Sequence, residues 1–254
     1  AIFTNNKDLL FNIKSVLYSH GHDISCIITS QYNHEFNHSI YHDEELKQIP
    51  LINIQYNNRK NKLIYKVLYN LDIDLCILID YPLELLDTSL ITLASLGIVH
   101  VQDSLLPKYR GPNATRHVLY NNETITGLTI HRIKSIDQIM SGPILVQRQV
   151  NVDVNDNYHT LWKKYLSKME EMWIEALAKL IGHEIGKLQQ QNVDIFKSYP
   201  NGALNYDTSH DINRIEWSKT ALQIHNQIRA LYGTSLNATA KIQHYQIQKR
   251  QFEI

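Results

Sequence analysis

Short apolar runs alternate with longer amphipathic segments through the first hundred residues, and this alternation limits the possible folds more than any other feature. Four segments are short and apolar: 1–4, 23–30, 74–80 and 98–103. Three segments between them have helical periodicity: 6–21, 60–71 and 85–97. Strands that alternate with helices are typical of parallel sheets with crossover helices. We therefore expect an open α/β sheet that binds its ligands beyond the carboxyl ends of the strands.

The pattern changes after residue 103. Residues 126–133 and 142–152 are typical of two adjacent strands, and residues 158–181 have the apolar spacing of a long helix. The apolar positions of that helix predict a core face: Leu161, Tyr165, Met169, Trp173, Leu177 and Leu180. Residues 31–59 are polar and irregular around one short strand at 51–56. We expect a main domain over 1–185 and a C-terminal extension over 186–254, made of a connection, a helix and a short β tail.

Charge and composition exclude some classes of partner. The 25 basic residues balance the 25 acidic ones, so no overall field favours nucleic acid or an anionic membrane. No apolar run approaches the roughly 18 residues of a membrane span. Cys26 and Cys76 lie in apolar runs and are expected to be buried thiols, not a disulfide or a metal pair. We expect a cytoplasmic protein that acts on a small molecule.

The sequence His34-Glu35-Phe36-Asn37-His38 matches the zinc motif H-E-x-x-H. On a helix this spacing places two imidazoles on one face, with the glutamate as general base. The flanking residues are polar and directly follow a predicted core strand, so we expect a loop here. Chance spacings are also expected among 13 histidines. We therefore expect no metal site.

Two polar side chains interrupt the apolar strand at 98–103. His100 and Gln102 are two residues apart, and residues i and i+2 of a strand point to the same face. An imidazole and an amide would therefore act at one place.

The segment around this strand, GIVHVQDSLLPKYRGP, resembles the signature of the folate-dependent formyltransferases. In that family a strand carries Asn-x-His and is followed by Leu-Leu-Pro-Lys-Tyr-Arg-Gly. Three further segments are similar to family motifs, in the same order along residues 70–233: NNETITGLTIHRI, SGPILVQ, and INRIEWS with HNQIRAL. The resemblance implies a formyltransferase-type open mixed sheet with helices on both faces and a short C-terminal extension. The start, FTNNKDLL, is most similar to the sugar N-formyltransferases.

The resemblance also implies a chemistry. In the family an amine attacks the formyl carbon of 10-formyltetrahydrofolate, an asparagine and a histidine stabilise the oxyanion, and an aspartate assists the histidine. Here His100 occupies the asparagine position and Gln102 the histidine position. Met140 stands at the aspartate position, in a loop about two residues longer than the family pattern. Asp137 is the residue of that loop that can replace the aspartate.

Other functional residues are implied by position. Contacts to the pterin of the folate are expected from two segments that depart from the family pattern: Pro82, Leu83, Glu84, Leu85, Ile139 and Met140. Candidate contacts to the acceptor are Asn5, Asn6, Asp103 and His131. For Asn5 and Asn6 a helix cap is an alternative role. For His131 packing beside the cleft is the favoured role, and a contact to the acceptor is the alternative. We expect Trp217 and Arg229 to fasten the C-terminal segment.

Three interpretations remain open. In the first, the amide and the imidazole have exchanged roles, so that His100 is the acid/base and Gln102 donates to the oxyanion. This displaces the proton shuttle by about 6–7 Å along the strand. In the second, formyl transfer is lost and the chain is a catalytically silent binding or regulatory protein. In the third, the cleft transfers a group from a different donor.

The acceptor and the assembly are expected from the same resemblance. A small amino sugar, carried on a nucleotide, fits the balanced charge better than tRNA, and the chain ends soon after HNQIRAL, without room for the full barrel domain of the tRNA enzymes. The tail KIQHYQIQKRQFEI alternates apolar and polar residues, which is typical of an edge strand that must be covered. We expect a homodimer that pairs these tails.

Overall fold

The computed structural model describes residues 1–30, 34–54, 62–81, 88–134, 140–188, 215 and 217–232. The chain divides into two compact units. The first combines residues 1–102, 129–148 and 166–191, and the second combines 103–128, 149–165 and 192–254. The predicted β tail and most of the predicted connection lie outside the described residues, so the domain boundary at 185 and the homodimer stay predictions.

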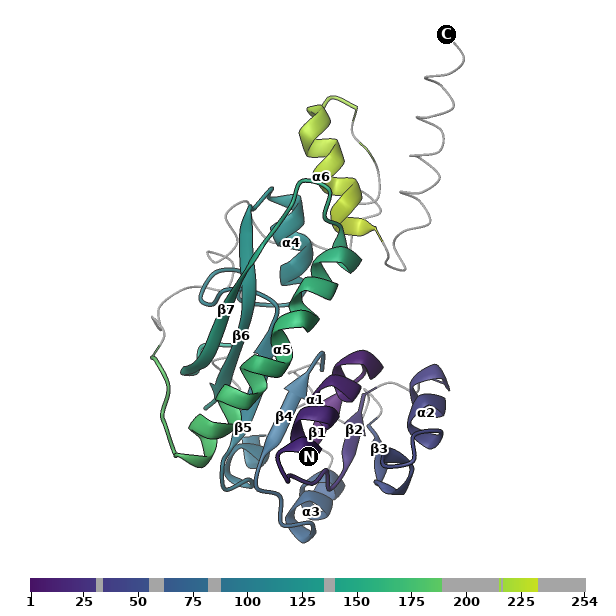
Figure 1. Cartoon of the computed structure of the whole chain (residues 1–254), viewed down its shortest axis with the longest axis vertical. Coiled ribbons are helices and arrows are strands. Elements are labelled where there is room, and N and C mark those ends of the chain that lie inside the picture. The colour runs from purple at the N-terminus through teal and green to yellow at the C-terminus, as the bar shows by residue number, and fades with distance from the viewer. Residues whose placement is uncertain are drawn as a thin grey trace. The chain divides into compact units, whose positions relative to one another are not determined.

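The strands form one sheet of seven (Figure 1). They are β1 Ile2–Thr4, β2 Ile27–Thr29, β3 Leu51–Asn53, β4 Cys76–Ile79, β5 Ile98–Gln102, β6 Ile125–Ile133 and β7 Ile144–Asn151. Their order is β3-β2-β1-β4-β5-β6-β7. Strands β1 to β5 are parallel, whereas β6 runs antiparallel to β5. The mixed α/β sheet predicted from the sequence is confirmed.

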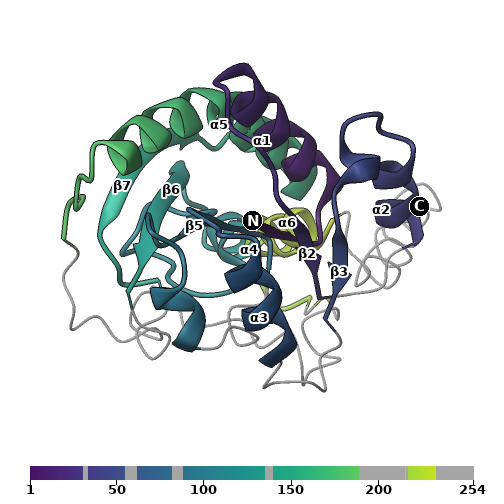
Figure 2. The same cartoon turned by 90° about the horizontal axis from the view of Figure 1, so that it is seen from below.

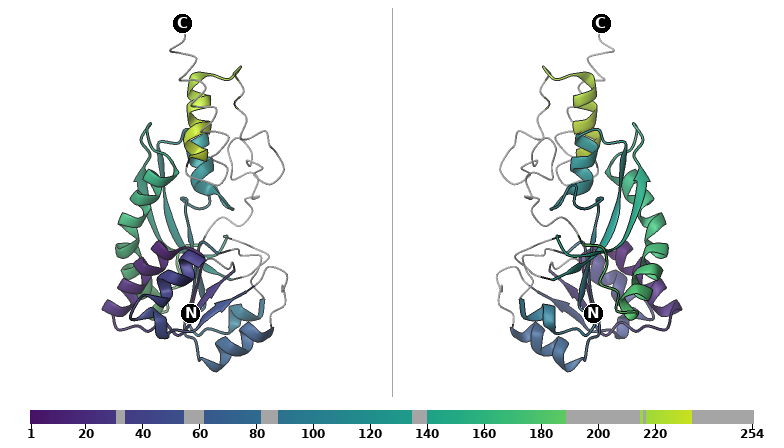
Figure 3. Two further views of the ribbon diagram at one scale, coloured as in Figure 1. Left: turned by 90° about the vertical axis from the view of Figure 1, so that its right-hand side faces the viewer. Right: turned by 90° about the vertical axis from the view of Figure 1, so that its left-hand side faces the viewer.

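Six α-helices lie in the described part of the chain: α1 Lys7–Ser19, α2 His34–Tyr41, α3 Lys62–Asn70, α4 Ala114–Tyr120, α5 Tyr158–Ile181 and α6 Ala221–Leu231. Helices α1 and α3 cover opposite faces of the parallel strands, as Figures 2 and 3 show. Among the described helices none is long and apolar enough to cross a membrane.

Helix α5 has the bounds that its apolar spacing predicts. The six predicted core positions are all buried, and Trp173 and Tyr165 are among the largest fully buried side chains. The predicted burial of Cys26 and Cys76 is also confirmed, and burial raises the pKa of the Cys76 thiol to about 11. Periodicity was sufficient here because a long helix and central strands bury one continuous apolar face.

The helix predicted over 85–97 and the loop predicted at 34–38 are wrong. The segment 85–97 was expected to be a helix, but only a short 3-10 helix, Thr88–Thr92, is described there. Gly97 has φ +83°, and the backbone N–H of Leu96 bonds to the carbonyl of Asp74 and not within a helix. Helix α4 was not anticipated, because seven residues after a Gly-Pro turn are too few to show a period.

The H-E-x-x-H segment is helical and not a loop, since it forms α2. Phe36 and Ile40 are buried and seat the helix, so the polar flanks misled the sequence-based expectation. The Glu35 carboxylate pairs with the ammonium of Lys7, and the His38 ring packs on His42 at 4.0 Å between centroids. No group of three potential metal ligands occurs in the ranges that the structure describes.

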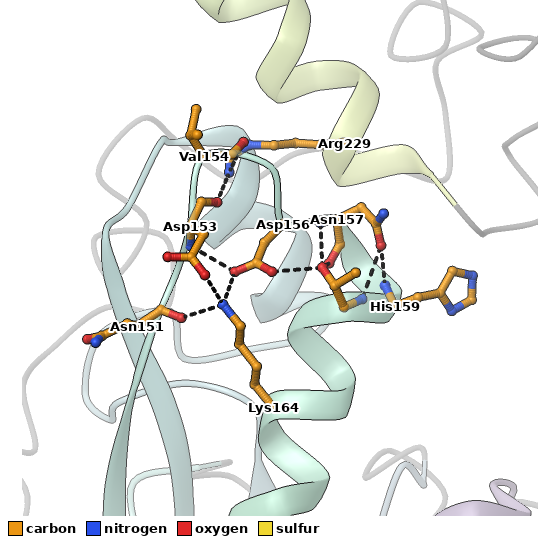
Figure 4. Close-up of polar contacts among 9 residues, drawn as sticks. Asn151, Asp153, Val154, Asp156, Asn157, His159, Lys164 and Arg229 are labelled. Atoms are coloured by element: carbon orange, nitrogen blue, oxygen red, sulfur yellow. Dashed lines mark hydrogen bonds and ion pairs between the residues drawn. The ribbon is translucent and has the colours of Figure 1, made fainter.

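Arg229 fastens α6 within the second unit, as its motif predicts. Its guanidinium donates to the carbonyls of Asp153 and Val154 (Figure 4). It also donates to the carbonyl of Leu119. Trp217 does not share this role, because 64% of its surface is exposed.

The turn that receives Arg229 is itself held by Lys164. Its ammonium donates to the carbonyl of Asn151 and pairs with Asp153 and Asp156 (Figure 4). This arrangement fixes the segment between β7 and α5 to which Arg229 donates.

Candidate functional site

The polar residues of β5 lie opposite polar residues of β6. In the antiparallel register His100 pairs with His131, and Gln102 pairs with Thr129. Residues directly opposite each other in such a ladder have Cβ atoms about 4.5–5.5 Å apart. All four side chains are buried, with 5% of His100 and 2% of Gln102 exposed. The sheet therefore carries a buried polar row inside strands that are otherwise apolar.

A hydrogen bond of 3.1 Å joins Nδ1 of His100 to Nε2 of His131. A second bond of 3.1 Å joins Nδ1 of His131 to the carbonyl of Arg132. A carbonyl only accepts, so Nδ1 of His131 carries a proton. In the neutral ring Nε2 of His131 is then an acceptor, and Nδ1 of His100 is the donor. The basic nitrogen of a neutral His100 is therefore Nε2.

The environment keeps His100 neutral. Burial lowers the pKa of His100 well below its usual value, and the neighbouring charge of His131 lowers it further. Both effects act in the direction expected for an imidazole in a medium that penalises the charged form. At neutral pH His100 is therefore a neutral ring with a lone pair on Nε2.

The row continues onto β7 through an amide. Nε2 of Gln147 donates to Oγ1 of Thr129 at 2.9 Å. Gln102 and Gln147 therefore flank the Thr129 hydroxyl from two neighbouring strands. Amide groups placed in this way can donate to a developing oxyanion, which is the role that the exchanged arrangement gives to Gln102.

The loop residues of the predicted site are only partly described. Met140 is buried at 8% exposure and has φ +60°, an uncommon conformation for this residue type. Asp137 and Ile139 lie outside the described residues, as do Pro82, Leu83, Glu84 and Leu85. Their predicted roles at the proton shuttle and the pterin stay predictions.

The candidate acceptor contacts in the first unit have structural partners. Oδ1 of Asn5 accepts from the Thr29 hydroxyl and the Ser30 backbone N–H, and its Nδ2 donates to the Ser30 hydroxyl. Asn5 thus ties the end of β1 to the end of β2. Asn6 caps α1 by accepting from the backbone N–H groups of Asp8 and Leu9. This is the alternative role that the sequence allowed.

Asp103 also has a structural partner, in the second unit. Its carboxylate accepts from the backbone N–H of Thr115 at 3.0 Å and from the Thr115 hydroxyl. This contact fastens the first turn of α4 to the residue that follows β5. A contact from Asp103 to an acceptor stays a prediction.

A Lys-Tyr pair follows the cis peptide at Leu106-Pro107 and has a structural role. The Lys108 ammonium pairs with Glu123 at 2.6 Å, and the Tyr109 hydroxyl donates to the same carboxylate at 2.6 Å. Asn121 donates to the Tyr109 hydroxyl at 3.2 Å. Two of the family-like segments, LLPKYRG and NNET, are therefore joined by one carboxylate. The sequence signal for this contact was that both segments resemble family motifs and occur in the family's order.

The sheet and the polar row define an α/β protein with a buried imidazole–amide site beside the carboxyl end of a central strand. Residues 9–177 match the family model described as formyl transferase. The match covers more than half of the chain, so this protein belongs to the formyl transferase family. A formyltetrahydrofolate donor is implied by the family, and the acceptor differs among its members.

The curated relatives include methionyl-tRNA formyltransferases. That of Thermotoga neapolitana is 32% identical over 170 residues, which are 63% of this chain and 53% of the relative. That of Lactiplantibacillus plantarum is 33% identical over 149 residues, 58% of this chain and 44% of the relative. The chain thus spans about half the length of the curated relatives that it matches.

Solved structures with the same fold have other acceptors in their names. A 4-N formyltransferase from Francisella tularensis superposes with a TM-score of 0.63 at 19% identity, covering 91% of this chain and 86% of its own. The phosphoribosylglycinamide formyltransferase of Bacillus halodurans superposes with a TM-score of 0.60 at 22% identity, covering 71% of this chain and 93% of its own. At these identities the likeness establishes the fold alone.

Proposed function

We propose that this protein transfers the formyl group of 10-formyltetrahydrofolate to the amine of a small acceptor, an amino sugar carried on a nucleotide. His100 accepts the proton of the amine, and Gln102 donates to the oxyanion. One observation carries the proposal. The hydrogen-bonded pair of His100 and His131 lies beside Gln102 where the family has Asn-x-His.

The proposed step balances with these residues. The acceptor nitrogen attacks the formyl carbon, and the carbonyl oxygen becomes an oxyanion to which the Gln102 amide donates. Nε2 of His100 takes one proton from the attacking nitrogen. The bond between the formyl carbon and N10 of the folate then breaks, and N10 leaves with the proton that His100 returns. A neutral imidazole at the start is required, and the lowered pKa of His100 supports this state.

The choice of a small acceptor rests on charge and on resemblance. The chain has no net charge, so a polyanion such as tRNA gains no general electrostatic attraction. The N-terminal segment FTNNKDLL is similar to that of sugar N-formyltransferases. Both features support an amino sugar over tRNA.

A second candidate is a catalytically silent homologue that binds a ligand or a partner. The burial of His100 and Gln102 favours it, because a reacting group must meet its substrate. The buried Met140 at the aspartate position also favours it, since a thioether cannot stabilise an imidazolium.

Calorimetric titration with 5-formyltetrahydrofolate, followed by assay of tetrahydrofolate release with a panel of nucleotide-linked amino sugars, tests the proposal. We expect binding in the micromolar range, about −8 kcal/mol, and release that depends on one of the amines. His100→Ala should abolish release, and Gln102→Ala should lower kcat about 10²-fold through loss of one oxyanion donor. Binding without release by any amine would favour the silent homologue. Absence of binding heat at saturating folate would overturn the donor itself.

A further inference from the structure

The two rings of the polar row form a directed chain of hydrogen bonds. The chain runs from Nδ1 of His100 to Nε2 of His131, and from Nδ1 of His131 to the Arg132 carbonyl, at 3.1 Å each. Because the last acceptor cannot donate, the direction of both bonds is fixed in the neutral pair. The second ring thereby selects the tautomer of the first.

We propose that His131 is a positioning residue that holds His100 in the tautomer whose basic nitrogen is Nε2. This inference rests on the proposed function, because only a proton acceptor needs a selected tautomer. His131 performs for His100 what a carboxylate performs for an acid/base imidazole: it orients the ring and accepts from the nitrogen that does not react. Met140 stands where the family has its aspartate and cannot orient an imidazole as a carboxylate does. His131, on the strand opposite His100, orients the ring instead.

The end of the chain is held rigidly. The Arg132 guanidinium donates to the carbonyls of Leu96 at 2.8 Å and Glu184 at 2.9 Å. Its backbone N–H donates to the Pro143 carbonyl at 2.9 Å. Both the backbone N–H and the side chain of Arg132, the residue that presents the final carbonyl, are therefore held by neighbouring carbonyls.

The pair stores one extra proton. When Nε2 of His100 takes the proton of an amine, the proton on its Nδ1 shifts to Nε2 of His131, and the positive charge then resides on His131. His100 is again neutral, now protonated at Nε2, and the reverse shift restores a donor for N10 of the folate. No proton or electron is gained or lost by the pair over the cycle. Two charges on adjacent buried rings are disfavoured, so the pair titrates as a unit.

In the part of the chain that the structure describes, one charged neighbour shifts the pKa of His100. That neighbour is His131. Leu78 of β4 lies opposite His100 in the parallel register and is apolar. A change in the protonation of His100 on mutation of His131 is therefore attributable to the removed ring.

Long-range ¹H–¹⁵N correlation on protein labelled at histidine nitrogens reads the tautomer without any substrate. In the parent we expect His100 to be protonated at Nδ1 and bare at Nε2 near neutral pH. His131→Leu removes the acceptor, and His100 should change to the Nε2–H tautomer. His131→Gln places an amide oxygen near the former Nε2 and should retain the Nδ1–H tautomer. The matched control is His117→Leu, which removes another buried histidine and should leave the His100 signals unchanged.

The kinetic readout separates this inference from the proposed function. His131→Leu should lower kcat by about 10²- to 10⁴-fold with little change in KM, and His131→Gln should recover most of that loss. A parent His100 that is protonated at Nε2 overturns the inference, whatever the activity. Equal tautomers in the parent and in His131→Leu also overturn it. If the tautomers are as expected but the parent releases no tetrahydrofolate, the proposed function is overturned. The hydrogen bonds between the two rings then have a structural role only.

Discussion

Replacement of Arg229 by methionine tests the physical meaning of the family-like HNQIRAL segment. The guanidinium is 5% exposed and forms five hydrogen bonds. The bonds to Asn226 at 2.9 Å and to Asp153 at 3.0 Å are short, and the three others span 3.2–3.3 Å. Methionine keeps the apolar stem and removes every donor, so the change isolates the polar contribution.

The magnitude follows from what is left behind. The carbonyls of Asp153 and Val154 keep second donors, the Asp156 backbone N–H and Nε2 of His225. The Leu119 carbonyl likewise keeps a backbone donor. No backbone carbonyl is orphaned, but the buried Oδ1 of Asn226 loses its donor. The two short charge-assisted bonds contribute about 1.5 kcal/mol each at the lower end of the usual range, and the orphaned oxygen adds to their loss. We expect Arg229→Met to lower the free energy of unfolding by about 3 kcal/mol or more.

Urea unfolding followed by far-ultraviolet circular dichroism measures this loss, and Arg148→Met is the matched control. Arg148 pairs with Glu171 and Glu175 on the surface, with 32% of its side chain exposed. Surface pairs contribute about 1 kcal/mol or less. If the two variants lose the same stability, or if Arg229→Met loses less than Arg148→Met, the buried guanidinium is not the anchor of α6.

Two other changes give separate outcomes. A Cβ added at Gly142 would lie 1.7 Å from the carbonyl oxygen of Arg132. Gly142→Ala must therefore displace β6 backbone and should reduce the free energy of unfolding by about 3 kcal/mol, which chemical denaturation measures; an unchanged midpoint would contradict this packing. Acid should also destabilise the protein through His117, whose pKa burial lowers to about 4. His117 binds a proton at about pH 6.5 in the unfolded chain but only near pH 4 in the folded chain. Protonation of the unfolded chain therefore lowers the free energy of unfolding by about 1.4 kcal/mol for each pH unit between about pH 6.5 and pH 4, and above pH 6.5 this loss is absent. His117→Phe should flatten the dependence of stability on pH by that slope, and an unchanged slope would show that His117 is not buried in its neutral form.

The fold was predictable where one segment carries the whole signal. Helix α5 has its own apolar period over 24 residues, and β4 is a continuous apolar run. Helix α4 is too short to show a period, and α2 is seated by only Phe36 and Ile40 among polar residues. Local pattern fails at such elements because a few long-range contacts, and not a repeating face, decide the structure.

Only the part of the candidate site that lies within one strand was predictable, because local pattern does not report contacts between strands. The period of two places His100 and Gln102 on one face of β5, and the sequence contains that information. The bond from His100 to His131 depends on the register between two strands whose bonded residues are 31 positions apart. Nothing local to either strand fixes that register. His131 was therefore predicted as an acceptor contact or as packing, and its partnership with His100 emerged only from the pairing of β5 with β6.

The register between β5 and β6 supports the proposed placement of an imidazole at position 100 and an amide at position 102. The residue opposite 100 is His131, which can accept a proton and pass on its charge. The residue opposite 102 is Thr129, whose hydroxyl already accepts from Gln147 at 2.9 Å. An imidazole at 102 would face that hydroxyl, which cannot stabilise an imidazolium as a second ring does. Under the proposed exchange, the imidazole therefore lies at the position of the pair where the neighbouring strand supplies a base, His131.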